Sequence, residues 1–441
     1  MRLIYVFISF SCQIKLLFFS KIMKTVLLLG VGRSTQTLIK YLTTNATKLN
    51  IKIVLADQAS NNFIQPYIQQ ELCTFLPLDI NDTIRRKNHI SNADLIISML
   101  PPKFHYIVAK DCIEFKKNLI TASYVSEEIA KLDQDAKKAN ILILNEVGLD
   151  PGIDHISAMD VIDRLKEQGA SINVFKSFCG GLIAPESDDN PWNYKFTWNP
   201  KNVVLAGSSG ASYLKNGSIK TFDYNQVFSN LETISIPNYG LFESYANRDS
   251  LHYQEKYALS DAQTIVRGTL RKVGFAKAWD VFVQLGMTSE SKKTKLISEK
   301  QFNSYMESLG DPDIQSKMDY LDLFNRKYNI EKLSPSDYLI KVLQDKWALD
   351  QDDIDMIVMQ HKFEYVQNKQ SKKLQLSMVV KGDNNIHTAM AKTVGLPVFF
   401  ACKLLLQDKV NLKGVRIPIY KEIYQPILEQ LSLEGINFVE S

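Results

Sequence analysis

Short apolar runs alternate with amphipathic stretches between residues 24 and 145, and this alternation constrains the fold of the chain more than any other feature. Six such runs, rich in branched residues, occur at 25–29, 51–56, 74–78, 94–100, 118–123 and 141–145. Continuous β-branched runs separated by helical sequence are typical of a parallel sheet covered on both faces. The pattern therefore predicts an α/β fold, a doubly wound Rossmann-type sheet over residues 23–148.

The pattern changes after residue 148. Strand and loop signals continue without regular crossover helices, which predicts an α+β domain with a mixed sheet over residues 149–389. Within it, residues of about 287–360 are helical and charged and predict a helical insertion. The runs at 361–366 and 374–380 predict paired strands around a polar turn. From Ile386 the sequence predicts helix with a break at Gly395–Pro397, and residues 390–441 are expected to pack back on the first domain.

Composition is that of a globular protein, with 45% apolar and 23% charged residues among 441. The net charge of +4 is small and the charges are interspersed, so neither nucleic acid nor a membrane is expected as a partner. Five scattered cysteines without a CxxC motif predict no disulfide framework, no metal site and a cytoplasmic location.

Residues 1–22 do not fit the rest of the chain. Their apolar run is interrupted by Lys15, and Met23 stands directly before the first predicted strand. We interpret this segment as a mis-set start or a disordered extension rather than a signal peptide.

A glycine turn follows the first predicted strand. Gly30 permits the tight turn, Gly32 allows a close approach of a pyrophosphate, and the next three residues open a helix whose N-terminus favours anions. These residues predict a dinucleotide site formed by Gly30, Gly32, Arg33, Ser34 and Thr35.

Asp57 ends the second predicted strand, where an acidic side chain accepts hydrogen bonds from the ribose hydroxyls and repels a 2′-phosphate. This position predicts NAD as the cofactor. NADP is the alternative, because Arg33 could meet a phosphate. Ser98, Leu100 and Leu149, at the ends of later strands, are expected to complete the cofactor site.

The segment from Asn145 to Trp198 contains NEVGLDPGIDH, FCGGLIAPE and NPWNYKFTW. Glycine, proline and polar residues dominate it, and its core-forming periodicity is weak. Loops of this kind after strands of an α/β sheet commonly bind ligands.

Together with ADLIISMLPPKFHYIVAKDC, TASYVS, YANRDS and TIVRGTLR, these blocks resemble the saccharopine dehydrogenase (glutamate-forming), or saccharopine reductase, family. The resemblance extends from Gly30 to about Gly286 and returns at residues 413–418. It implies an oxidoreductase of lysine metabolism that interconverts saccharopine with L-glutamate and 2-aminoadipate 6-semialdehyde by NAD(P)-dependent hydride transfer at an imine carbon. In residues 287–385 we place no motif.

The resemblance also implies where the amino-acid substrate binds, in a cleft between the two domains. Saccharopine carries three carboxylates, so arginine forks suit it. The positions that match substrate contacts of the family are Ser123, Tyr124, Asp150, Cys179, Arg248, Thr269 and Arg271.

Other roles compete at several of these positions. The arginines could form surface ion pairs with Asp249, Glu255 or Asp280, and Arg267 could either join the site or be structural. Asp150 could cap its loop, and Cys179 could be a small buried residue, which we favour.

No catalytic acid or base is assigned, because the imine nitrogen of the substrate can hold its own proton. His105 and His155 are the imidazoles nearest the motifs, and both have plausible packing roles. The chain departs from the family at Phe178, where a tyrosine is frequent, and at Trp192 and Asn193, which we expect to reshape the pocket.

Two other functions fit parts of the sequence. One is a related imine reductase such as carboxynorspermidine synthase, whose more cationic substrate would require an additional acidic cluster. The other is a non-catalytic NAD-binding module, which would have no need of the substrate blocks. A homodimer is kept as a hypothesis for the assembly.

Overall fold

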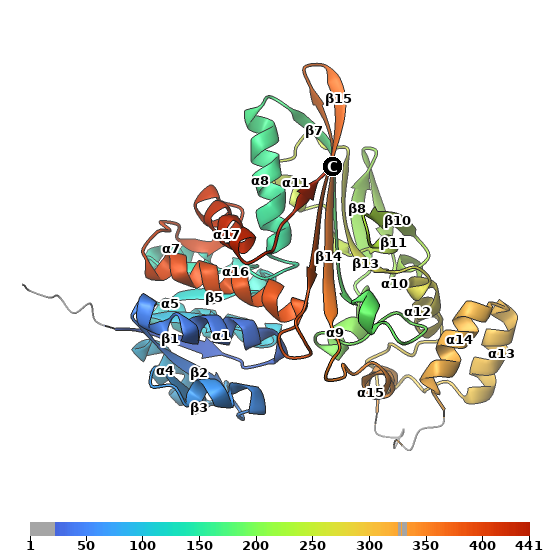
Figure 1. Ribbon diagram of the computed structural model, residues 1–441, viewed down its shortest axis with the longest axis horizontal. Helices are drawn as coiled ribbons and strands as arrows, with labels where there is room; N and C mark the ends of the chain where they lie inside the picture. The colour runs from blue at the N-terminus through green and yellow to red at the C-terminus, as the bar shows by residue number, and fades with distance from the viewer. Residues whose placement is uncertain (1–22, 325–327, 329–332) are drawn as a thin grey trace, which may run out of the picture.

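The structure is a computed structural model and describes residues 23–324, 328 and 333–441; the interpretation of residues 1–22 lies outside this range. Figure 1 shows two sheets, with the long strands of the second standing between the first sheet and a group of helices on the far side.

The first sheet has seven parallel strands in the order β16-β6-β5-β4-β1-β2-β3. This order is that of a dinucleotide-binding sheet with one strand added from the end of the chain, so the predicted fold class is confirmed. The strands are β1 (Lys24–Leu29), β2 (Ile51–Asp57), β3 (Cys73–Pro77), β4 (Leu95–Ser98), β5 (Asn118–Thr121), β6 (Leu142–Leu144) and β16 (Gly414–Arg416).

Both faces of this sheet are covered, as the continuous apolar runs predict. Along β1, Val26 and Leu28 belong to one core cluster, whereas Leu27 and Leu29 belong to another on the opposite face. The helices of this half of the chain are α1 (Gln36–Thr44), α2 (Ala46–Leu49), α3 (Gln65–Ile68), α4 (Thr83–Asn92), α5 (His105–Glu114), α6 (Glu127–Ala130) and α7 (Asp133–Lys138).

The second sheet is mixed and has the main order β10-β11-β13-β7-β14-β15-β17, with β8, β9 and β12 attached beside it. β13 is parallel to β7, while β14 and β15 form the predicted antiparallel hairpin. Its strands are β7 (Ser171–Ile183), β8 (Ala211–Lys215), β9 (Ser218–Phe222), β10 (Leu231–Ile236), β11 (Gly240–Ala246), β12 (Arg248–Asp249), β13 (Thr264–Lys272), β14 (Asp355–Gln367), β15 (Gln370–Lys381) and β17 (Val439–Glu440).

Eight helices described between residues 153 and 346 accompany this sheet. The last three form the predicted helical insertion, although β14 already begins at Asp355, so the helical character ends earlier than residue 360. Trp192, Trp279 and Trp347 are at the centre of its core. The helices are α8 (Ile153–Glu167), α9 (Pro200–Val204), α10 (Tyr224–Val227), α11 (Tyr253–Lys256), α12 (Phe275–Gln284), α13 (Glu299–Leu309), α14 (Pro312–Leu321) and α15 (Pro335–Lys346).

The end of the chain returns to the first sheet through α16 (Ala389–Leu406), β16 and α17 (Lys421–Leu433). The predicted break at Gly395–Pro397 is wrong, because α16 continues through both residues. A Cβ atom at Gly395 would lie 2.8 Å from the backbone nitrogen of Leu38, so this glycine allows α16 to pack closely on α1. Among the described helices, α16 alone has the length and hydropathy of a membrane span, and 83% of that span is buried within the fold.

Replacing Gly395 with alanine is expected to destabilise the protein. In an open helix this change would stabilise by about 1 kcal/mol, but here the added methyl group meets backbone, and overpacking costs about 1–3 kcal/mol. Urea unfolding should therefore show a lower midpoint for Gly395→Ala, while Lys392→Ala on the same helix changes it little. A raised midpoint for Gly395→Ala would contradict the close helix contact.

Candidate active site

The glycine turn lies where the sequence predicts it, between β1 and α1. Gly30 has a φ of +91°, and a Cβ atom there would lie 2.9 Å from the carbonyl carbon of Met99 at the end of β4. Gly32 has open space beside it, and its carbonyl accepts hydrogen bonds from the backbone N–H and the side-chain hydroxyl of Thr35 at 3.0 and 2.7 Å. The two hydrogen bonds from Thr35 thus stabilise the turn, and the open space beside Gly32 leaves room for a phosphate.

Asp57 reaches this turn from the end of β2. Its Oδ2 accepts from the N–H of Val31 at 2.7 Å, and Oδ1 accepts from the N–H of Gln58 at the same distance. Each carboxylate oxygen retains a further lone pair, so these bonds orient the carboxylate and leave it able to accept from a ribose.

The other predicted cofactor residues differ in exposure. Arg33 is exposed, Ser34 and Leu100 are half-buried, and Leu149 is buried. Ser98 is fully buried, and its hydroxyl is bonded to Nδ1 of His105 at 2.9 Å, so its side chain supports the site from within.

His105 connects the cofactor end of the sheet to the predicted substrate loop. Its Nε2 lies 2.7 Å from the hydroxyl of Ser123, and burial lowers the pKa of the imidazole to about 4. Ser98, His105 and Ser123 therefore form a chain of hydrogen bonds in which a neutral imidazole accepts at one nitrogen and donates at the other.

Odd-numbered residues of β13 share one face of the second sheet, because side chains alternate along a strand. Ile265 packs into the core shared with α8 and α16, while Val266 and Leu270 pack into a separate core on the other face. Arg267, Thr269 and Arg271 consequently lie on the same face as Ile265, opposite to Val266 and Leu270.

Arg267 is the most heavily bonded side chain of this face. Its Nη2 donates to Asp150 and, at 2.5 Å, to Oδ2 of Asp154, while Nη1 donates to the hydroxyl of Tyr253. The phenol of Tyr124 donates to Oδ1 of Asp150 at 3.0 Å. Asp150 is therefore an ion-pair partner rather than a loop cap, and Arg267 is fully engaged within the protein.

Arg271 lies two positions further along and has a different environment. It is 4% exposed and is surrounded by the rings of Tyr194, Tyr245 and Phe275, whose centroids lie 5.1–5.9 Å from the guanidinium carbon. Nη1 donates to the carbonyl of Leu270, and Nε has no partner. Within residues 23–324, 328 and 333–441, no carboxylate forms a salt bridge with Arg271.

The remaining predicted substrate residues gather around these two arginines. Thr269 on β13 is paired in register with Cys179 on β7. Burial raises the pKa of the Cys179 thiol well above its ordinary value, in keeping with a small packing residue. Arg248 is exposed, has a φ of +53°, and its guanidinium lies 5.3 Å from the ring centroid of Tyr124.

Two departures from the family pattern lie away from this face. The Phe178 ring belongs to the core on the opposite face of the sheet, so the absent hydroxyl does not face the arginines. Trp192 is fully buried in the helical insertion and donates to the carbonyl of Lys317, so the expectation that it lines the pocket is wrong. Asn193 donates to Asp188 in the same loop.

The sequence did not reveal the partners of Arg267. Asp154 is 1% exposed on the first turn of α8, and an acid among the buried residues of a helix indicates a buried cation nearby, but this burial is known only from the structure. Glu146 and His155, both within the NEVGLDPGIDH block, form a second buried pair at 2.7 Å that the sequence did not predict.

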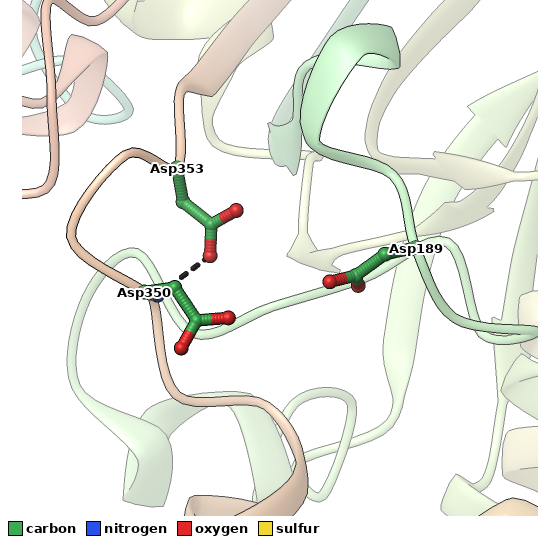
Figure 2. Close-up of side chains that lie close together, drawn as sticks. All are labelled: Asp189, Asp350 and Asp353. Carbon is green, nitrogen blue, oxygen red and sulfur yellow. Dashed lines mark hydrogen bonds between the residues drawn. The ribbon is translucent and has the colours of Figure 1, made fainter.

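One group of carboxylates in the described ranges could by geometry hold a metal ion, and Figure 2 shows its members, Asp189, Asp350 and Asp353. The ammonium of Lys195 lies 2.8, 3.4 and 2.8 Å from their respective oxygens. Lys195 thus supplies positive charge to the three carboxylates. These ion pairs connect the loop that contains Asp189 to the segment directly before β14.

These features define a class of protein. A dinucleotide-binding sheet faces a second sheet that presents buried arginines and carboxylates, which is the arrangement of a NAD(P)-dependent dehydrogenase acting on a small charged substrate.

Comparison with known proteins specifies the family. The domain described as "Saccharopine dehydrogenase NADP binding domain" matches residues 26–144, and "Saccharopine dehydrogenase C-terminal domain" matches residues 148–436. The chain belongs to the saccharopine dehydrogenase family.

Three relatives illustrate the similarity. The "Saccharopine dehydrogenase [NADP(+), L-glutamate-forming]" of Pyricularia oryzae is 32% identical, with 92% of this chain and 96% of the relative covered. The mitochondrial alpha-aminoadipic semialdehyde synthase of Rattus norvegicus is 36% identical over 94% of this chain, which spans 47% of that protein's length. The apo structure of saccharopine dehydrogenase (L-Glu forming) from Saccharomyces cerevisiae superimposes with a TM-score of 0.84 at 30% identity, covering 95% and 99% of the two chains.

The buried His105 predicts a pH dependence of stability. Its pKa in the folded protein, about 4, lies below the ordinary value of 6.5, so the unfolded chain binds the proton more readily. The stabilisation is present above pH 6.5 and is lost as the pH falls toward 4. Thermal melts should show a smaller loss of stability over this range for His105→Gln than for the wild type, and an identical loss would contradict the neutral buried imidazole.

Proposed function

We propose that this chain interconverts saccharopine with L-glutamate and 2-aminoadipate 6-semialdehyde, using a nicotinamide dinucleotide. The fungal relatives are named L-glutamate-forming saccharopine dehydrogenases and match over nearly their whole length, which supports this reaction. The longer semialdehyde synthases are about twice the length of the chain, so their further activities are not carried over.

The contrast between Arg267 and Arg271 is the observation that carries the proposal. Arg267 is neutralised by two carboxylates of the protein, whereas Arg271 is a buried cation without a carboxylate partner in the described ranges. An isolated buried charge is costly, and a substrate carboxylate would supply the missing partner in bidentate geometry. Arg271 therefore favours a substrate with a carboxylate that reaches the guanidinium group among these aromatic rings.

The opposite end of the same face suits an amino group. Tyr124 and Asp150 offer acceptors there, and burial raises the pKa of Asp150 against the opposing charge of Arg267. A carboxylate site and an amine site separated along β13 fit an amino acid held at both ends. Arg248 at the exposed edge is a second carboxylate candidate, since its guanidinium forms no ion pair with any described carboxylate.

The reaction requires alignment more than strong acid–base catalysis. A hydride leaves the carbon beside the secondary amine of saccharopine, the C–N bond becomes an imine, and water then cleaves the imine to an aldehyde and glutamate. Bound nicotinamide supplies the hydride acceptor. The protein residues hold both ends of the substrate, and Asp150 can accept a proton from the amine nitrogen.

We further propose NAD as the preferred dinucleotide. Asp57 is oriented by two backbone hydrogen bonds at the ribose-reading position, where its charge opposes a 2′-phosphate. The names of the fungal relatives contain NADP(+), and Arg33 is exposed beside the turn. We favour NAD over NADP because the negative charge of Asp57 would repel the 2′-phosphate of NADP.

A polyamine-forming imine reductase fits the site less well. Its more cationic substrate would require a carboxylate in addition to Asp150, but Asp154 is buried and paired with Arg267, and Arg271 adds a positive charge.

Arg271→Gln is expected to lower kcat/KM for saccharopine. Loss of a charge-assisted hydrogen bond costs about 1.5–3 kcal/mol, or roughly 10- to 150-fold. Reduced-cofactor absorbance measures the rate. Lys272→Gln, the next residue on the opposite face of β13, is the matched control and should remain near the wild-type rate. Wild-type kcat/KM in Arg271→Gln would refute the carboxylate role.

Asp57→Asn is expected to narrow the preference for NAD over NADP. Asparagine keeps an oxygen acceptor for the N–H of Val31 but removes the charge that repels the 2′-phosphate. The ratio of kcat/KM values for the two cofactors should fall roughly tenfold, which corresponds to about 1.4 kcal/mol. An unchanged ratio would show that Asp57 does not select the cofactor.

A further inference from the structure

Glu146 is a buried carboxylate that follows β6, outside the residues assigned to the substrate. It is 1% exposed and has a φ of +60°, which is uncommon for a residue with a side chain. Burial alone would raise its pKa, but the hydrogen bond and charge of His155 lower the pKa to about 2. The chain therefore keeps a charged group at a position where burial is costly, which calls for an explanation.

The bonds of Glu146 enclose Tyr124. The backbone N–H of Glu146 donates to the carbonyl of Ser123 at 3.1 Å, and its Oε1 accepts from the N–H of Val125 at 3.0 Å. Tyr124 is the residue between those two bonds, and its phenol donates to Asp150. One residue thus holds the backbone on both sides of a predicted substrate contact.

Glu146 is itself fixed to the frame that holds Arg267. Its Oε2 lies 2.7 Å from Nε2 of His155, whose Nδ1 lies 2.6 Å from the hydroxyl of Tyr257. The His155 ring stacks on Tyr253 at 5.8 Å, and the hydroxyl of Tyr253 accepts from Arg267. One connected network consequently positions both the backbone and the hydroxyl group of Tyr124.

We propose that Glu146 is a positioning residue for the reaction, which holds residues 123–125 so that the Tyr124 hydroxyl stays on Asp150 where the substrate amine binds. This inference rests on the proposed function. It requires no contact between Glu146 and the substrate. Its effect arises because small displacements of a substrate-binding group cost large factors in rate.

The test is a double-mutant cycle with Glu146→Leu and Tyr124→Phe, after wild-type turnover of saccharopine has been established. Glu146→Leu is expected to lower kcat/KM at least tenfold and to leave the dissociation constant of NADH, measured by its fluorescence, unchanged within about twofold. Because Glu146 acts through Tyr124, adding Tyr124→Phe should cause little further loss. Three results would each overturn the proposal. One is a loss of kcat/KM in the double variant that equals the product of the losses in the two single variants. The others are a tenfold weaker NADH complex and an unchanged kcat/KM in Glu146→Leu.

Glu146→Gln guards against a folding defect in the leucine variant. Glutamine keeps an oxygen for the N–H of Val125 and can pair with His155. The Glu146→Gln variant should therefore retain at least a third of wild-type kcat/KM. Adding Tyr124→Phe to it should lower kcat/KM by the same factor as Tyr124→Phe lowers it in the wild type. A tenfold loss in Glu146→Gln with a wild-type melting temperature would overturn the positioning role. If the wild type itself does not turn over saccharopine, the proposed reaction fails instead, and that result is separate from the cycle.

Discussion

The ion pairs of Arg267 with Asp150 and Asp154 are the interaction on which the rest of the site depends. They join β13, the loop after β6 and the first turn of α8, which are far apart in the sequence. A buried guanidinium is tolerated because two carboxylates and the hydroxyl of Tyr253 satisfy it, and removal of one partner of such a pair costs about 3–5 kcal/mol. This contact holds Asp150 and Asp154 beside β13, while one apolar core that includes residues of α8, α16 and both sheets joins the two domains.

The two arginines of β13 differ in their partners, and on this difference we base the proposed division into a structural and a binding arginine. Arg267 forms its hydrogen bonds within the protein, whereas Nε of Arg271 has no partner among the described residues and the guanidinium is surrounded by aromatic rings. Asp353 is likewise neutralised within the protein, because the ammonium group of Lys195 lies 2.8 Å from its carboxylate. The family assignment and this distribution of charge support the same kind of substrate, an amino acid with separated carboxylate and amino groups.

Much of the fold could be predicted because its signals are local. Apolar runs, the Gly30 turn and the motif blocks all act over a few residues, and β1 to β6 and the β14–β15 hairpin lie where they indicate. The short strands β16 and β17 lie in a closing segment that was predicted to be helical, because their pairing partners are distant in the sequence. Contacts between distant segments could not be read in this way. The helix α16 continues through Gly395 because of Leu38, and Arg267 binds acids more than 100 residues away.

The proposed role of Arg271 can be examined in a crystal structure with saccharopine bound. We expect a substrate carboxylate within hydrogen-bond distance of the Arg271 guanidinium, while Arg267 remains paired with Asp150 and Asp154. A carboxylate bound by Arg267 in place of Asp150, with Arg271 still without an anionic partner, would contradict it.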